Sequence, residues 1–162
     1  MSHKFKFQVY TACIVQKLLY GLDGAVLSKA DKKKLDAFHV RCIRKILRIS
    51  PAFISRVTNK FVLQKMCALP LSQVLHERQL VLFGIIFRLP DHNALRQIVF
   101  KPGGIELIDI ENRRVGRPKN AWAPMTLKHA LQIVDNQAQL LTIIADPIAW
   151  KSHVKCESSR IS

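Results

Sequence analysis

Basic side chains along one expected helix are the residues whose type and spacing most clearly predict chemistry in this sequence. Between Ser28 and Ser50, at about 100° per residue, cations gather on one side of the helix and apolar residues on the other. No carboxylate lies among these cations, so this face is suited to bind an anion; an ordinary solvated surface is the alternative. The candidate contacts on this helix are Lys33, Lys34, Arg41, Arg44, Lys45 and Arg48.

A second set of cations lies in residues 101–119, KPGGIELIDIENRRVGRPK, where glycines and prolines replace helical periodicity. Arginine side chains on such a backbone can follow phosphates or enter a narrow minor groove. Gly-Arg-Pro is also the centre of the AT-hook, but Val115 stands where that motif has arginine. We therefore expect backbone binding rather than minor-groove recognition, with a solvated linker as the alternative. The candidates in this basic arm are Arg113, Arg114, Arg117 and Lys119.

Two His-x-x-Cys pairs are the candidates for metal binding. His39 with Cys42, and His153 with Cys156, have the i, i+3 spacing that points two ligands one way from a helix. Structural zinc sites usually show the tighter Cys-x-x-Cys spacing, and Cys42 also fits an apolar helix face. We therefore expect no metal and no cofactor, and the sequence leaves open whether the four side chains meet in space.

The amino-acid composition indicates which class of partner this chain binds. Lys and Arg number 26 against 11 Asp and Glu, which gives a formal net charge of +15 over 162 residues. A soluble domain of this size is usually designed with a net charge of roughly 2 to 8. The excess predicts a polyanion, either a nucleic acid or an acidic membrane surface. The strongest apolar run, residues 80–87, is far shorter than the roughly 20 residues that span a membrane, so we expect no membrane span and no secretion.

Motifs for catalysis are absent from the sequence. It contains no Gly-x-Ser-x-Gly, no phosphate-binding glycine loop and no His-Glu-x-x-His. The four cysteines are widely spaced, which indicates a reducing compartment without disulfides. We expect no enzymatic activity from this chain alone.

Helices must position these residues. In the basic helix, Ser28 is expected to be the N-cap with Asp31 as its capping partner, and Ser50-Pro51 to end the run. An apolar stripe should face the core, and it consists of Leu35, Phe38, Cys42 and Ile46. Further helices are expected over 5–21, 59–66, 71–89, 93–100 and 122–144, with a last turn or helix from Asp146-Pro147.

Two smaller features complete the expected fold. Residues 105–110, IELIDI, alternate as a short strand does but have no obvious partner. Trp122 and Trp150 are expected to anchor helices to a core, with base stacking as the alternative. We predict an all-α fold, a helical bundle with an irregular basic arm, in three parts: a thumb-like domain (1–100), the arm (101–119) and a C-terminal helical segment (120–162).

The order of five segments resembles the region after the palm of non-LTR (LINE-type) retrotransposon reverse transcriptases, over roughly residues 5–150. The segments are LLYGLD (18–23), LDAFHVRCIRKILRI (35–49), VTNKFVL (57–63), PLSQVLHERQLVLFGIIFRLPD (70–91) and RRVGRPKNAW (113–122). This sequence departs from the family pattern at Asp23, where Glu is usual, and at Gly24-Ala25, where a hydroxyl residue and Trp are usual. It also departs at Ile85, where many members have a polar residue, and at Val115.

The resemblance implies a thumb and post-thumb region that grips the template-primer backbone. Polymerisation in that family needs a Tyr/Phe-x-Asp-Asp turn, and this chain has no Asp-Asp pair. We therefore expect a non-catalytic fragment, nuclear in location, that binds RNA, DNA or an RNA–DNA hybrid. The rival is a structural or interaction subunit of a larger assembly, with its basic surface against an acidic protein or lipid. RNA versus DNA preference, oligomeric state, and fragment versus decayed copy stay open.

Overall fold

The computed structural model describes residues 2–108, 121–134 and 136–160, and side chains as far as Cys156. These residues form helices and a single isolated β-bridge, so the all-α prediction is confirmed. The chain divides into two compact units, Met1–His76 and Glu77–Ser162, each described here by itself. This division differs from the predicted boundary at residue 100, because Phe83 and Phe100 share a core with the C-terminal helices.

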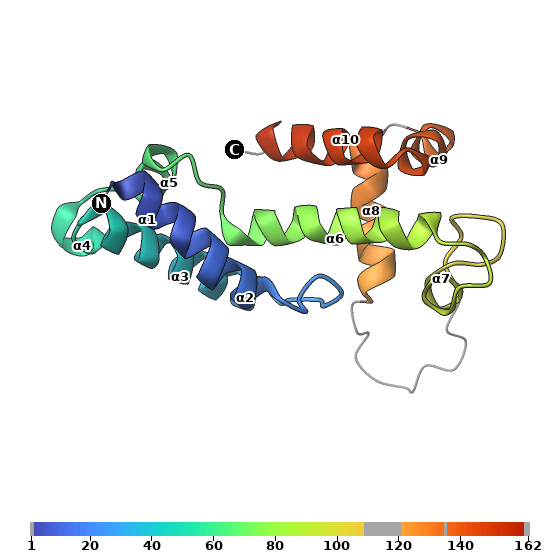
Figure 1. The fold of residues 1–162 in the computed structure, drawn as a ribbon, viewed down its shortest axis with the longest axis horizontal. Coiled ribbons are helices and arrows are strands. Elements are labelled where there is room, and N and C mark those ends of the chain that lie inside the picture. Colours follow the sequence, from blue (N-terminus) through green and yellow to red (C-terminus); the bar gives the residue numbers. More distant parts are fainter. Residues whose placement is uncertain (1, 109–120, 135, 161–162) are drawn as a thin grey trace. The chain divides into compact units, whose positions relative to one another are not determined.

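The first unit contains α1 (His3–Tyr10), a π-helical turn η1 (Thr11–Val15), α2 (Gln16–Leu19), α3 (Lys29–Leu47), α4 (Ala52–Ser55) and α5 (Asn59–Lys65). It also contains the start of α6 (Leu71–Arg88). Figure 1 shows α1 and α2 alongside α3, where Tyr10, Val15 and Leu19 pack with Leu35. A second cluster on α3, Val40 and Ile43, packs against α5.

The π turn decides which side of the first helical run is buried. Periodicity over residues 5–21 predicts apolar positions at Val9, Cys13, Val15, Leu18 and Leu19. Of these, Val15 and Leu19 are buried, together with Tyr10, whereas Val9 and Cys13 are exposed. In a regular α-helix, Tyr10 and Val15 would lie about 140° apart. A π turn accommodates an extra residue, which brings these two side chains onto one face.

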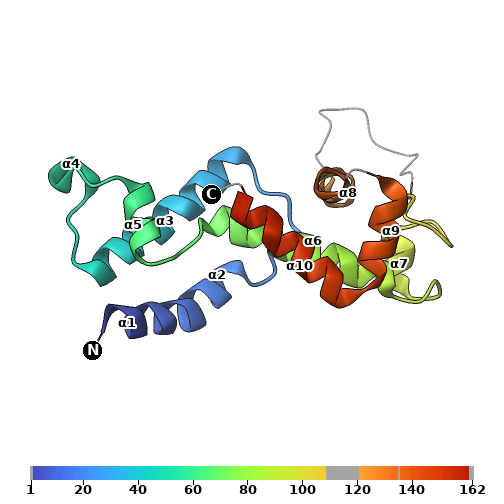
Figure 2. The same ribbon diagram turned by 90° about the horizontal axis from the view of Figure 1, so that it is seen from above.

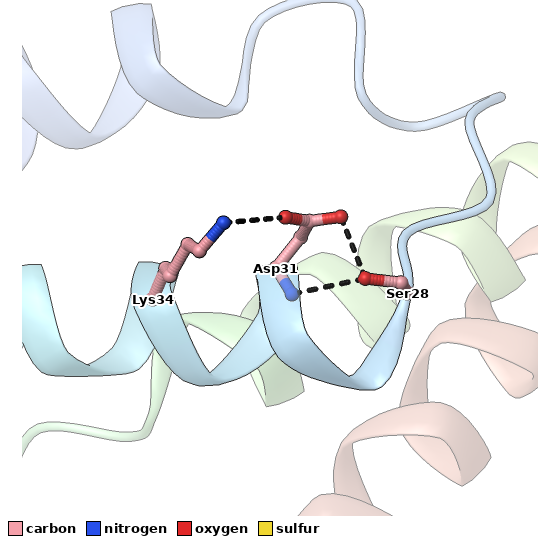
Figure 3. Close-up of polar contacts among 3 residues, drawn as sticks. All are labelled: Ser28, Asp31 and Lys34. Carbon is pink, nitrogen blue, oxygen red and sulfur yellow. Dashed lines mark hydrogen bonds and ion pairs between the residues drawn. The ribbon is translucent and has the colours of Figure 1, made fainter.

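The beginning of α3 is capped by Ser28 (Figure 3), as the sequence predicted. The Ser28 Oγ accepts from the Asp31 backbone N–H at 3.1 Å, and its hydroxyl donates to the Asp31 carboxylate at 2.6 Å. The carboxylate thus reaches the hydroxyl rather than the backbone N–H of a standard capping box. The Ser28 hydroxyl, and next Lys34, lower the pKa of Asp31.

The end of α3 comes earlier than the sequence predicted. The helix stops at Leu47 because Arg48 takes the left-handed conformation, with φ of 57°. Its N–H donates to the Lys45 carbonyl and the Ile49 N–H donates to the Arg44 carbonyl, the paired bonds of a Schellman motif. Cys67 ends α5 in the same way, with φ of 50°.

Asp36 links α3 to the start of α6. Its two carboxylate oxygens accept from the backbone N–H and the hydroxyl of Ser72, at 2.8 and 2.7 Å. The first N–H groups of a helix have no partner within the helix, so this carboxylate acts as the cap that α6 itself lacks.

A buried histidine lies between α1 and α3. The Tyr10 hydroxyl lies 2.9 Å from Nδ1 of His39, and the two rings stack. Burial lowers the pKa of His39, against the opposing effects of Asp36 and of a hydrogen bond to the Leu69 backbone. Burial, and then Cys42, raises the pKa of Tyr10. Both groups are therefore held neutral in the folded state at neutral pH.

The second unit is built on the remainder of α6 together with α7 (Ala94–Val99), α8 (Trp122–Ile133), α9 (Gln137–Ala145) and α10 (Pro147–Arg160). Figures 1 and 2 show α10 beside α6, with α8 crossing them. The single helix predicted over 122–144 is two helices, because Asn136 caps α9 by accepting from the Ala138 N–H. The predicted start at Asp146-Pro147 is confirmed, since Asp146 accepts from the Ile148 N–H at 2.8 Å.

Trp150 is the central side chain of the second unit. It is fully buried, and its indole N–H donates to the Leu80 carbonyl at 2.9 Å. Gly84 makes this possible: a Cβ at that position would lie 2.5 Å from the Trp150 ring. Trp122 is half-buried and packs on Phe83, with ring centroids 6.2 Å apart. Both tryptophans therefore belong to the core, as predicted.

Arg96 organises the segment after α7. Its guanidinium is buried and donates to Asp91 at 2.7 Å and to the Phe87 and Gly104 carbonyls, while lying 5.0 Å from the centroid of the Phe87 ring. The predicted strand at 105–110 contributes one bridge, from Leu107 to Phe100, so it does find a partner in the residue that follows α7.

We predict that Gly84→Ala destabilises the second unit by about 1–3 kcal/mol, the usual cost of overpacking a core. The new methyl group would collide with an indole ring that its hydrogen bond to Leu80 holds in place. Chemical denaturation followed by tryptophan fluorescence measures the effect, because both tryptophans lie in this unit. The control is Gly24→Ala, whose Cβ would meet no atom within 4 Å. Equal denaturation midpoints for the two variants would contradict the prediction.

We also predict that stability falls as the pH is lowered below about 6.5. The unfolded chain has an ordinary histidine pKa of about 6.5, whereas burial lowers the pKa of folded His39. The unfolded state therefore binds more protons in this range, and the free energy of unfolding decreases by up to about 1.4 kcal/mol per pH unit. Denaturation at pH 5 and at pH 7.5, followed by circular dichroism, measures this change in the free energy of unfolding. His39→Gln should flatten the dependence, and the exposed His153→Gln should not.

Candidate nucleic-acid interface

The predicted contacts on α3 divide into exposed cations and one buried arginine. Exposed are Lys33, Lys34, Arg41, Lys45 and Arg48. Lys34, Arg41 and Lys45 lie within about 40° of one another around the helix and extend about 16 Å along its axis. Lys33 lies farther round α3, and Arg48 lies just beyond its last turn. We call the three aligned residues the basic stripe.

Lys34 has a neighbour that the sequence interpretation overlooked. Its ammonium group lies 3.4 Å from an Asp31 oxygen, so a carboxylate does stand at one end of the stripe (Figure 3). Both side chains are at least half exposed, and solvent screening leaves an ion pair in that setting with little stabilising effect. A phosphate group can therefore compete for Lys34.

Arg44 corrects the sequence prediction. We expected it on the exposed basic face, but only 6% of it is exposed. Its guanidinium donates to the carbonyls of Ser50 and Val57, to the Ser55 hydroxyl and to the Asn59 amide oxygen. Three of these acceptors lie in the segment that leaves α3, forms α4 and leads on to α5, and Asn59 is the first residue of α5. Arg44 therefore holds this segment in place and is not a surface cation.

A pocket of about 550 Å³ lies beside the basic stripe, and the periodicity of α3 does not predict it. It forms where α4 turns back toward the second half of α3. Its walls are mostly apolar, with Arg41 and Lys45 as its exposed cations. Phe53 on α4 lines it and is 84% exposed, which is unusual for so large an apolar side chain. The lining residues are Ala37, Val40, Arg41, Arg44, Lys45, Ile49, Pro51, Ala52, Phe53 and Asn59.

The charge is concentrated in the first unit. Residues 1–76 contain 14 Lys and Arg against 3 Asp, or +11 of the total +15. Two of these carboxylates are engaged, Asp31 with Ser28 and Lys34, and Asp36 with Ser72. Neither Arg41 nor Lys45 makes an ion pair in the part of the chain that the structure describes. The positive field around the pocket therefore remains uncompensated.

The other predicted sites stand as follows. Arg113, Arg114, Arg117 and Lys119 lie outside the described residues.

His39 and Cys42 belong to the first unit and His153 and Cys156 to the second, and His39 is already engaged by Tyr10. Among the described residues, no group of three or more His, Cys, Asp or Glu side chains could hold a metal ion. Cys13 and Cys67 are exposed.

Comparison of the chain with protein-family models, with curated proteins and with solved structures finds no match. Over the described ranges, none of the helices has the length and apolar character needed to cross a membrane.

We predict that Arg44→Met destabilises the first unit by about 2 kcal/mol or more, because the segment after α3 loses a charged donor to four acceptors. Lys45→Met, one position away and exposed, should change stability by less than about 0.5 kcal/mol. Denaturation followed by circular dichroism compares the two. Equal effects would show that the Arg44 hydrogen bonds contribute nothing to the fold.

Proposed function

We propose that this chain binds the sugar-phosphate backbone of nucleic acid, with little dependence on base sequence, through the exposed cations of the first unit. The observation that supports it best is the basic stripe, Lys34, Arg41 and Lys45, on a unit with a net charge of +11. Phosphate contacts supply most of the affinity of sequence-tolerant binding, and they require exposed cations of this kind. Lys33, farther round α3, and Arg48, just beyond its last turn, are further exposed cations of this unit.

The resemblance to the thumb and post-thumb region of non-LTR retrotransposon reverse transcriptases supports the same proposal. In such an enzyme this region holds the template and primer behind the polymerase site, which fits RNA, DNA or an RNA–DNA hybrid as the ligand. The chain has no Asp-Asp pair to hold catalytic metal ions, so the proposed role is binding without catalysis. A nuclear location follows from the resemblance alone.

The proposal is tested by a salt titration of binding to fluorescent single-stranded RNA, duplex DNA and an RNA–DNA hybrid. We expect affinity to fall steeply between about 50 and 200 mM salt, with the hybrid bound most tightly. Changing Lys34, Arg41 and Lys45 together to Gln should weaken binding to all three ligands and reduce the salt slope by about 2, since each lost phosphate contact removes about 0.7–0.9.

The control for this experiment removes the same charge elsewhere in the first unit. Lys17, Lys60 and Lys65 are exposed, and changing them together to Gln should reduce affinity and slope much less. If both triple variants lose affinity equally, the chain binds as any polycation does. The basic surface would then be assigned to assembly with an acidic protein or lipid.

A further inference from the structure

The pocket between α3 and α4 has a feature that backbone binding does not use. One of its walls is the exposed Phe53 ring, on a helix of a single turn. Burial of such a side chain is normally favourable by about 1.5–3 kcal/mol, a gain that the fold leaves unused here. An exposed aromatic ring beside cations is the arrangement that single-strand binding proteins use to stack bases.

The wall that carries Phe53 is held rigidly. Arg44 donates to Ser50 before α4, to Ser55 within it and to Val57 after it. The Ser55 hydroxyl also donates to the Ser50 carbonyl at 3.0 Å. The backbone that carries the ring is thus held beside the pocket before any ligand arrives, and a preorganised backbone loses less conformational entropy on binding.

The charges around the pocket select an anionic occupant. Arg41 and Lys45 line it, and none of its lining residues is acidic. Asn59 contributes a polar group whose orientation is fixed: its amide oxygen accepts from Arg44 at 3.1 Å, which leaves its NH₂ group as a donor. The pocket therefore offers an aromatic face, a hydrogen-bond donor and two cations within one volume of about 550 Å³.

We propose that this pocket takes one unpaired nucleotide of a single-stranded nucleic acid, with the base against Phe53 and the phosphate at Arg41 and Lys45. This inference rests on the proposed function and adds a preference for single strands with accessible bases. The volume lies within the range of about 300–1,000 Å³ that small-molecule sites occupy. A helical protein partner would instead need a continuous apolar groove for residues at i, i+3, i+4 and i+7.

The experiment compares two fluorescent single-stranded DNA probes of equal length and charge, oligo-dT and an abasic strand. The full chain should bind oligo-dT at least about fivefold more tightly, since base–aromatic stacking is worth this much or more. Phe53→Ala should remove the difference without changing affinity for the abasic strand or the salt slope. Phe53→Leu, which keeps most of the apolar area but not the ring, should also lose most of the preference for oligo-dT.

The matched control is Ile54→Ala. Ile54 neighbours Phe53 on α4 and is 63% exposed, but it does not line the pocket, so its removal should leave the preference for oligo-dT intact. A probe with a single 2-aminopurine adds a direct readout, because its fluorescence should fall on binding to the full chain and not on binding to Phe53→Ala.

The outcomes separate the two proposals. Equal affinity for both probes, unchanged by Phe53→Ala, would overturn the nucleotide pocket and leave backbone binding in place. Absence of salt-dependent binding to either probe would overturn the proposed function itself. Self-association that Phe53→Ala abolishes, with the probe preference unaffected, would reassign the pocket to a contact between copies of the chain.

Discussion

Two buried arginines, one in each unit, hold an irregular segment in place within the part of the chain that the structure describes. Arg44 donates to acceptors before, within and after α4, and Arg96 donates to the Phe87 and Gly104 carbonyls and to Asp91. Such segments have few backbone partners of their own, and buried carbonyls without donors are costly. Guanidinium carries five donors in one plane and stays charged, so it can bind more acceptors, spread over a wider area, than the three donors of a lysine ammonium can.

The helices that carry their own signals were predictable from the sequence. Ser28 and Asp31 mark the start of α3, and Asp146-Pro147 marks the start of α10, because a side-chain oxygen there meets backbone N–H groups of the next turn. The ends of α3, α4 and α5 were harder to place. They stop at Arg48, Arg56 and Cys67, and all three take the left-handed conformation that is usually a mark of glycine.

In the candidate site, the exposed cations were predictable from the sequence, but the burial of Arg44 and the pocket were not. Exposed cations such as Arg41 and Lys45 follow from helical periodicity alone. Arg44 is also an arginine and lies on nearly the same face of α3 as Arg41. It is buried because α4 and Asn59 return toward α3. The pocket depends on that same return, so helical periodicity does not predict it. The exposed pair Phe53 and Ile54 was the available signal, since a short polar loop rarely contains two large apolar residues.

The Asp36–Ser72 cap has a consequence for how the chain is made. The carboxylate and the helix it caps are 36 residues apart, and Asp36 is the earlier of the two in the sequence. A ribosome therefore releases the cap before it releases the helix, and α3 can already be folded when the first turn of α6 emerges. Nucleation is the costly step in helix formation, and an acceptor already in place for the Ser72 N–H lowers the cost of starting α6.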